Sequence, residues 1–171
     1  ERGLESDVAL GNSLLTMYGK CGSLMYVQMM FDSMHNKNTI SWNAIISFHV
    51  NSSNIDTAYE LFQQMVLNGV RLDKVSFLNF LSICLSQISI DQGRLIHSMI
   101  AENGFEMDME VANGLIMLYG KFANVIDAEG VFDKFQHHNV VTWTSMIAAH
   151  AQVGNSREVV NLFYKMQSNA V

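Results

Sequence analysis

The side chains best suited to recognition chemistry form a regular polar series within otherwise apolar stretches. Four polar residues and one leucine recur at intervals of 31, 35, 35 and 31 residues: Asn12, Asn43, Leu78, Asn113 and Thr144. A carboxamide offers both a donor and an acceptor, so it can meet the Watson–Crick edge of a pyrimidine. Polar residues that interrupt an apolar helical pattern are a local conflict that often marks function. These positions are therefore candidate base readers, and ordinary groove-lining amides are the alternative.

Two further polar series mark places where helices can begin. Ser, Asp and Asn are the preferred first residues of helices, because their side chains accept hydrogen bonds from free backbone N–H groups. They recur with the same spacing, once as Asp7, Asn38, Asp73, Asp108 and Asn139, and once as Ser23, Asn54, Ser89, Asn124 and Asn155. Each repeat therefore contains two predicted helix starts about 16 residues apart, and each candidate reader lies five residues beyond a start of the first series.

The chain also repeats itself at an offset of 101 residues. Val8–Val70 aligns without a gap to Met109–Val171, with identical residues at 17 of 63 positions, whereas average residue frequencies give about four by chance. Trp42 falls on Trp143 in this alignment. We expect both tryptophans to be largely buried at equivalent places in the core.

Length and periodicity together predict the fold class. Apolar residues such as Trp42, Ile45 and Ile46 follow helical spacing, and the 171 residues contain no proline that would interrupt a helix. Turns are predicted at Gly22, Gly69 and Gly154. Repeats of 31 to 35 residues with two helices each predict an all-α protein, an α-solenoid superhelix of stacked antiparallel helix-turn-helix repeats with the first helices on its concave face.

Signatures of catalysis, cofactor binding and metal binding are missing from the sequence. Gly114–Lys121 ends in Gly-Lys, but its spacing is one residue too long for a P-loop and Phe122 replaces the required Ser or Thr. His137 and His138 are adjacent, which favours a turn at the surface over a metal site. We expect no enzyme activity, no catalytic residue, no metal and no cofactor in this chain.

Composition limits the partners and the compartment. Ten Lys plus Arg and sixteen Asp plus Glu give a net charge of -6, which argues against a general polyanion binder but not against one with its cations on one face. Cys21 and Cys84 are the only cysteines, and two isolated thiols fit a reducing compartment. Polar residues interrupt the longest apolar stretches, so no membrane span and no membrane partner are expected.

Five stretches carry a resemblance to a known family. They are SLLTMYGKCGS, FDSMHNKNTISWNAIIS, LFQQMVLNGVRLDKVSFLNFLSICL, GRLIHSMIAENGF and NVVTWTSMIAAHAQVGN. The chain resembles pentatricopeptide repeat proteins, and its alternation of lengths resembles their plant subclass of mixed short, standard and long motifs. Four positions depart from the family pattern, which often has proline there: His35, Leu72, Met107 and Gln136.

The resemblance implies motif boundaries. Residues 1–7 would end a preceding repeat, followed by a short motif (8–38), a standard motif (39–73), a long motif (74–108), a second short motif (109–139) and a truncated standard motif (140–171).

The resemblance also implies that the fifth and last residues of a motif read one base together. The implied pairs are Asn12 with Asn38, Asn43 with Asp73, Leu78 with Asp108, and Asn113 with Asn139, while Thr144 has no partner within the chain. These pairs resemble readers of pyrimidine, uridine, any base, pyrimidine and purine, from 5′ to 3′. Apolar residues at or next to the second motif position would sandwich the bases: Val8, Ile40, Val75, Met109 and Val141. The second members of the pairs could also be only helix caps, and both roles are compatible.

Two classes of function follow. The first is a sequence-specific binder of single-stranded RNA in a mitochondrion or plastid, reading one base per repeat in RNA editing or processing, with editing-factor or ribonucleoprotein partners and no DNA partner. The second is a scaffold subunit of an organellar ribonucleoprotein such as a ribosome. Four lysines are candidates for phosphate contact, with an ordinary solvated surface as the alternative: Lys20, Lys37, Lys74 and Lys121. The retained Asn and Asp pairs favour the first class, and the net charge of -6 favours the second.

Overall fold

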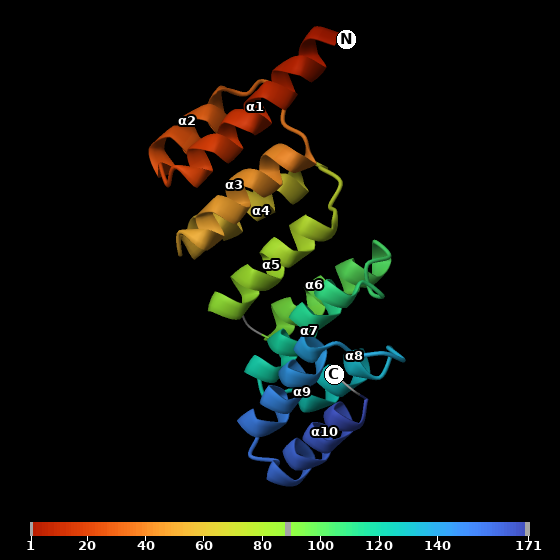
Figure 1. The fold of residues 1–171 in the computed structure, drawn as a ribbon. Helices are drawn as coiled ribbons and strands as arrows, with labels where there is room; N and C mark the ends of the chain where they lie inside the picture. The colour runs from red at the N-terminus through yellow and green to blue at the C-terminus, as the bar shows by residue number, and fades with distance from the viewer. Residues whose placement is uncertain (1, 88–89, 170–171) are drawn as a thin grey trace. The chain divides into compact units, whose positions relative to one another are not determined.

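The computed structural model describes residues 2–87 and 90–169, and within these ranges all regular secondary structure is α-helical (Figure 1). The helices are α1 (Arg2–Lys20), α2 (Leu24–Ser33), α3 (Thr39–Asn51), α4 (Ile55–Leu67), α5 (Lys74–Gln87), α6 (Ile90–Glu102), α7 (Met109–Lys121), α8 (Val125–Phe132), α9 (Val140–Gln152) and α10 (Ser156–Ser168). The prediction of an all-α chain is confirmed. None of the described helices combines the length and apolar character that crossing a membrane requires.

The chain divides into two compact units, with the boundary inside α5 between Ile83 and Cys84. In unit 1, α1 packs on α2 and α3, α2 packs on α3, and α3 packs on α4. In unit 2, α7 packs on α6, α8 and α9, α8 packs on α9, and α9 packs on α10. Helix α1 therefore contacts α3 directly, as α7 contacts α9, and the helices α2, α4, α8 and α10 each lie beside the odd-numbered helix that precedes them.

Four helix pairs are joined by turns of one common design. Residues Gly22, Ser53, Ala123 and Gly154 have positive φ angles of 71°, 59°, 55° and 73°. In the turn after α7, the Ala123 N–H donates to Gly120 O and the Asn124 N–H donates to Tyr119 O, each at 2.9 Å. This is the Schellman pattern, which satisfies the last carbonyl groups of a helix. Asn124, whose N–H makes the second of these bonds, is also the N-cap residue of α8, so the chain reverses direction within a few residues.

The predicted turns and most predicted helix starts are confirmed. Positive φ angles occur at Gly22, Gly69 and Gly154. Side chains of the residues preceding α3, α5, α7, α8, α9 and α10 accept from backbone N–H groups of those helices: Asn38, Asp73, Asp108, Asn124, Asn139 and Asn155. Ser23 and Asn54 precede α2 and α4 without such a bond. Ser89 lies outside the described residues.

The prediction of a helix start at Asp7 is wrong. Helix α1 begins at Arg2, so Asp7 lies inside it, and the segment that the sequence assigned to a preceding repeat continues directly into Val8. The reason is that no proline or turn interrupts residues 2–7, so an aspartate that could begin a helix is simply incorporated into one.

The two tryptophans occupy equivalent places in the core, as predicted. Trp42 is 6% exposed and Trp143 is 5% exposed. His49 and His150, which also correspond at the offset of 101 residues, are buried in α3 and α9. Close helix contact in unit 2 depends on Gly120, because a Cβ atom there would lie 2.9 Å from the Cβ and 3.2 Å from the Cα of Ala149.

Candidate nucleic-acid interface

Asn43 and Asp73 form a hydrogen-bonded pair between α3 and the start of α5. The Asn43 Nδ2 donates to Asp73 Oδ1 at 2.8 Å, and the Ser76 hydroxyl lies 2.9 Å from Asn43 Oδ1. Asp73 also accepts from the Ser76 backbone N–H at 2.9 Å, so it caps α5 while it holds the amide. Asp73 therefore both caps a helix and pairs with Asn43, two roles that were expected to be compatible.

The same arrangement occurs one repeat earlier in unit 1. The Asn12 Nδ2 donates to Asn38 Oδ1 at 3.3 Å, and the Ser41 hydroxyl donates to Asn12 Oδ1 at 2.6 Å. Asn38 begins α3 in a reciprocal capping box with Ser41, whose backbone N–H lies 3.1 Å from Asn38 Oδ1. The resemblance implied the pairs Asn12 with Asn38 and Asn43 with Asp73, and the structure brings the members of both pairs together.

Each of these pairs lies in a surface hollow that is flanked by apolar side chains. One hollow, of about 610 Å³, is lined by Asn12 and Asn38 together with Val8 and Ile40. The next, of about 230 Å³, is lined by Asn43 and Asp73 together with Ile40 and Val75. Ile40 is 61% exposed and borders both hollows, and Val75 is 46% exposed. Both hollows therefore combine amide groups with exposed aliphatic side chains.

The corresponding pair in unit 2 is built differently. Asn113 is 7% exposed, and its Oδ1 is buried without a hydrogen-bond partner. Asn139 caps α9 by accepting from the Thr142 backbone N–H at 2.9 Å. The Thr142 hydroxyl lies 2.9 Å from Asn139 Oδ1 and 3.4 Å from Met109 Sδ. Asn113 thus lacks the hydroxyl donor that Asn12 and Asn43 have.

The remaining predicted readers differ in their exposure and partners. Leu78 is half-buried on the part of α5 that belongs to unit 1, whereas Asp108 caps α7 in unit 2. Thr144 is exposed, and its hydroxyl bonds the carbonyl oxygens of Val140 and Val141 at 2.8 and 3.1 Å within α9. Of the expected sandwiching residues in unit 2, Met109 is half-buried and Val141 is 50% exposed.

Two of the four lysines considered for phosphate contact bond to the chain itself. The Lys37 Nζ donates to Met34 O at 2.6 Å and lies 5.0 Å from the centre of the Phe31 ring. The Lys121 Nζ donates to Leu85 O and lies 5.6 Å from the centre of the Phe122 ring. Lys20 is exposed at the end of α1, and Lys74 is half-buried at the start of α5. A phosphate would have to draw Lys37 and Lys121 away from these contacts.

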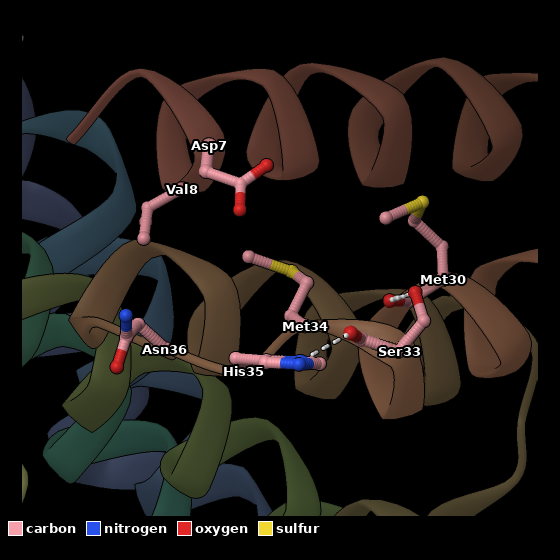
Figure 2. Close-up of a pocket in the computed structure, with 7 residues that line it drawn as sticks. All are labelled: Asp7, Val8, Met30, Ser33, Met34, His35 and Asn36. Atoms are coloured by element: carbon pink, nitrogen blue, oxygen red, sulfur yellow. Dashed lines mark hydrogen bonds between the residues drawn. The ribbon is translucent and has the colours of Figure 1, made fainter. Parts of the chain in front are cut away.

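A smaller hollow of about 160 Å³ lies next to the first pair but has a packing origin. Figure 2 shows its lining residues, with the Met34 side chain directed toward α1. A Cβ at Gly11 would lie 2.7 Å from Met34 Cε, so a glycine makes room for this methionine. The polar bonds drawn there are local, such as the one of 3.2 Å between His35 Nδ1 and Ser33 O. They stabilise the end of α2 and the residues that follow it.

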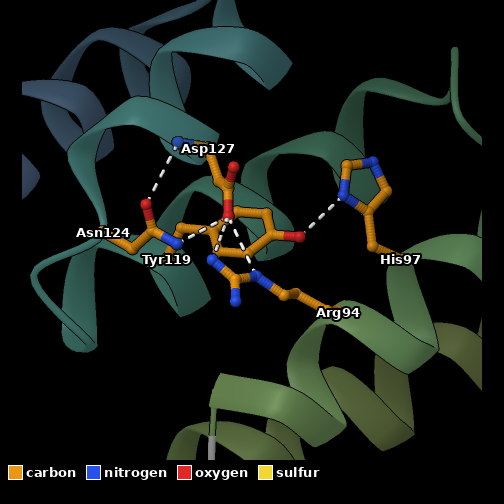
Figure 3. Close-up of polar contacts among 5 residues, drawn as sticks. All are labelled: Arg94, His97, Tyr119, Asn124 and Asp127. Carbon is orange, nitrogen blue, oxygen red and sulfur yellow. Dashed lines mark hydrogen bonds and ion pairs between the residues drawn. The ribbon is translucent and has the colours of Figure 1, made fainter.

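Unit 2 contains a polar cluster that joins α6 to α7 and α8 (Figure 3). Arg94 forms an ion pair with Asp127 at 3.3 Å, and Asp127 accepts from Asn124 Nδ2 at 2.5 Å. The Tyr119 hydroxyl lies 2.7 Å from His97 Nδ1. Burial raises the pKa of Tyr119 to about 12, so the phenol keeps its proton and can donate a hydrogen bond to Nδ1 of a neutral His97 imidazole. The cluster fixes helices to one another, and within the described residues no group of three or more His, Cys, Asp or Glu side chains could hold a metal ion.

Two established family models of short repeats match the amino-acid sequence of this chain. A model described as PPR repeat matches residues 12–39, 110–140 and 141–171, and a model described as PPR repeat family matches residues 37–85. The chain belongs to the pentatricopeptide repeat family. The assignment of short, standard and long motif classes, with their boundaries, stays a prediction.

Curated pentatricopeptide repeat proteins of Arabidopsis thaliana are similar over nearly the whole chain. The chloroplastic protein At1g11290 is 36% identical over 169 residues, which cover 99% of this chain and 21% of the relative. The mitochondrial protein At3g24000 is 33% identical over 165 residues, which cover 96% of this chain and 26% of the relative. The chain therefore spans only about a fifth to a quarter of the length of these relatives.

Solved pentatricopeptide repeat structures share the fold. The PPR domain of Arabidopsis thaliana protein-only RNase P 1, solved in complex with tRNA, has a TM-score of 0.77 at 11% identity, covering 96% of this chain and 91% of that one. Maize PPR10 in complex with an 18-nt psaJ RNA element has a TM-score of 0.71 at 17% identity, covering 94% of this chain and 24% of that one. These likenesses show the α-solenoid fold of stacked helix pairs.

The sequence did not single out the hydroxyl residues at this pentatricopeptide repeat interface. Ser41 and Ser76 are fully buried, and each touches both members of a pair. A signal was present, because Ser41, Ser76 and Thr142 each lie three residues beyond a predicted helix start. At Ser41 and Ser76, the residue at this capping-box spacing also contacts the candidate reader, whereas Thr142 at the same spacing forms no hydrogen bond with the Asn113 oxygen.

Proposed function

We propose that this chain binds single-stranded RNA in a sequence-dependent way, with one base per repeat. The observation that supports the proposal best is the hollow at Asn43 and Asp73, where a braced amide lies between the exposed aliphatic side chains of Ile40 and Val75. Single-stranded RNA offers unstacked bases whose edges hydrogen-bond and whose faces pack on flat or apolar surfaces. The repetition of this hollow at Asn12 and Asn38 supports a periodic ligand.

The base preferences follow from the pairs. Asn43, with a carboxylate beside it, is proposed to read uridine, and Asn12, with Asn38 beside it, is proposed to read a pyrimidine. Leu78 has no hydrogen-bonding side-chain group, so its repeat would discriminate little between bases. Asn113 would read a pyrimidine, and Thr144 would prefer a purine.

The cellular setting is proposed from the relatives. Similar proteins are named chloroplastic or mitochondrial, and a structure of the same fold holds an RNA element. We therefore propose an organellar role in RNA editing or processing, with the chemical step supplied outside the 171 residues. The catalytic signatures that such a step needs are not apparent in the sequence.

A scaffold role in an organellar ribonucleoprotein is the second candidate, and charge favours it. The net charge is -6, while Lys37 and Lys121 are held by main-chain carbonyl groups of the chain. RNA affinity depends strongly on phosphate neutralisation by cations. A protein or a folded rRNA surface would need fewer of these contacts.

The deciding experiment is a binding titration with single-stranded RNA at several salt concentrations. The oligonucleotides carry uridine, cytidine, adenosine or guanosine at the base opposite Asn43, with all other bases constant. We expect the tightest binding for uridine and an affinity that falls with salt. Equal affinity for the four oligonucleotides would reject base reading and favour the scaffold role.

A further inference from the structure

We infer that the buried hydroxyls of Ser41 and Ser76 set base selectivity, because each holds the reading amide of the preceding repeat with an N–H group, not its carbonyl, directed at the base. This inference rests on the proposed function. It assigns a positioning role to residues that face no ligand themselves. Both serines are 0% exposed, and each belongs to the first helix of the repeat after the one that contains the reader it contacts.

The chemistry of the Asn43 site leaves one orientation for its amide. The Asp73 carboxylate accepts from the Ser76 backbone N–H at 2.9 Å, and an ionised carboxylate can only accept. The Asn43 atom that lies 2.8 Å from Asp73 Oδ1 must therefore be the nitrogen. The oxygen is then on the side of Ser76, whose hydroxyl lies 2.9 Å away.

The hydroxyl proton of Ser76 has only two acceptors among the hydrogen bonds described. The Asp73 backbone N–H donates to Ser76 Oγ at 3.2 Å, so the hydroxyl hydrogen must point elsewhere. Its acceptors are Asn43 Oδ1 at 2.9 Å and Asp73 Oδ1 at 3.0 Å. Asp73 Oδ1 already accepts from an amide and a backbone N–H, whereas Asn43 Oδ1 has no second donor among the hydrogen bonds described. The proton therefore satisfies Asn43, whose oxygen would otherwise be a buried acceptor without a donor.

The orientation of the Asn12 amide is fixed in the same way, with the Asn38 amide in place of the Asp73 carboxylate. Asn38 Oδ1 accepts from the Ser41 backbone N–H, so its identity as oxygen is fixed, and the Asn12 atom facing it must be Nδ2. The Ser41 hydroxyl lies 2.6 Å from Asn12 Oδ1 and 3.1 Å from Asn38 Oδ1, so the shorter contact goes to the reader. The position of the hydroxyl, and not the charge of the partner, is what the two sites share.

Unit 2 provides the contrast within one molecule. Thr142 occupies the equivalent position, but its hydroxyl contacts Asn139 and Met109, and the oxygen of Asn113 is buried without a partner. Threonine is β-branched, which restricts the directions its hydroxyl can take on a helix. Asn113 is therefore not held by a hydroxyl, and its amide is free of the constraint that fixes Asn12 and Asn43.

An amide held in this way has one N–H left for the hollow. That hydrogen matches the O4 acceptor of uracil, the position at which cytosine has an amino group instead. It does not match the exocyclic amino group of cytosine, which needs an acceptor. If the hydroxyl is removed, the amide can turn and offer its carbonyl oxygen to that amino group. Ser76 should therefore sharpen the choice of uridine over cytidine at the base opposite Asn43.

The test compares Ser76→Ala and Ser41→Ala in the RNA titration, each against oligonucleotides that vary the base opposite Asn43 or Asn12. We expect Ser76→Ala to reduce the ratio of uridine to cytidine affinity at the Asn43 base by roughly threefold to tenfold, the range of one hydrogen bond, and to leave selectivity at the Asn12 base unchanged. Ser41→Ala should alter selectivity only at the Asn12 base. A loss of affinity that is equal for all oligonucleotides would show a merely structural role and overturn the inference.

A second measurement needs no RNA. In 15N relaxation measurements, the side-chain NH2 group of Asn43 should have a higher order parameter in the parent than in Ser76→Ala, because the hydroxyl stops the amide from turning about the Cβ–Cγ bond, while Thr142→Ser should raise the order parameter of Asn113. Unchanged order parameters in both variants would overturn the inference even if RNA binding is selective. A parent without base preference would reject the proposed function, and the order parameters would still decide whether the serines hold the amides.

Discussion

Phe31 at the end of α2 meets the indole of Trp42 in α3 edge-on, with ring centroids 4.9 Å apart and ring planes at 76°. Phe132 and Trp143 repeat this contact in unit 2, at 5.1 Å and 70°. Edge-to-face aromatic pairs contribute beyond the area they bury. The contact joins the second helix of one repeat to the first helix of the next, so it secures the stacking of repeats.

Trp42→Ala should therefore destabilise the chain by about 3–5 kcal/mol, the usual cost of truncating a buried aromatic residue. The free energy of unfolding from urea titration, followed by circular dichroism, measures it. Leu67→Ala is the matched control, because Leu67 is 85% exposed and its truncation should change stability by less than about 0.5 kcal/mol. Equal effects of the two variants would contradict the core role of Trp42.

Ala123→Gly should stabilise the chain by about 0.5–1 kcal/mol, because Ala123 has a left-handed backbone conformation that strains a side chain. Gly22 occupies the equivalent turn in unit 1. Gly22→Ala should accordingly destabilise by a similar amount, and the two variants serve as controls for each other. The midpoints of thermal unfolding should move in opposite directions, and a shift in the same direction would refute this explanation.

The two cysteines should react with thiol reagents at very different rates. Burial raises the pKa of the Cys84 thiol to about 12, and its side chain is 0% exposed, whereas Cys21 is exposed after α1. Because the thiolate is the reactive form, a colorimetric disulfide reagent at pH 8 should modify one thiol per folded chain and two in denaturant. Cys21→Ser should abolish the fast reaction. Rapid modification of both thiols in the folded chain would be inconsistent with the burial of Cys84.

Acidification should destabilise the chain in part through His97. Burial lowers the pKa of His97, and Lys134 lowers it further, while Glu106 and Asp127 act in the opposite direction. Burial also lowers the pKa of His49. A histidine whose pKa is lower in the folded chain takes up protons preferentially on unfolding, so its contribution is complete above about pH 6.5 and is lost as the pH falls through the folded value.

The measurement is the free energy of unfolding between pH 7 and pH 5. His97→Gln should reduce its pH dependence, and adding His49→Gln should reduce it again, because glutamine does not titrate in this range. If both variants keep the full pH dependence of the parent, other groups are responsible for it.

Asn43→Ala should relax base preference without abolishing binding. Removing the amide should reduce the difference in binding free energy between uridine and the other bases opposite Asn43 by about 1 kcal/mol, the scale of one hydrogen bond. Lys74→Ala serves as a comparison: if Lys74 contacts phosphate, its loss should weaken the binding of all sequences alike and reduce the salt dependence. Fluorescence anisotropy with matched oligonucleotides separates the two outcomes, and a uniform loss for Asn43→Ala would argue against its reading role.

Periodic features of the fold were predictable from the sequence, whereas the details that depend on neighbouring elements were not. The burial of Trp42 follows from a repeat of aromatic residues at one spacing, and the cap at Asn38 follows from residue type. Asp7 shows the limit of predicting helix starts from residue type, because an aspartate that can cap a helix does not by itself end the helix that contains it.

In the candidate site, too, some contacts were predictable from the sequence and others were not. The pairing of Asn43 with Asp73 was expected from the family pattern, and the structure contains it. The contribution of Ser76 was not expected, because it depends on where a hydroxyl points after two helices have packed. The unpartnered oxygen of Asn113 was equally hidden, since Ser and Thr look interchangeable in a sequence and differ in the direction of their hydroxyl groups.

The sharing of Ser76 between repeats has a consequence for protein engineering. A repeat excised at Asp73 and fused to a new neighbour leaves behind the hydroxyl that contacts its reader. A neighbour with valine at that position, as Val111 follows Asp108, would supply only a backbone N–H. The modules that can be exchanged between arrays without altering their selectivity should therefore end at Ser41 and Ser76, three residues beyond the conventional motif boundaries.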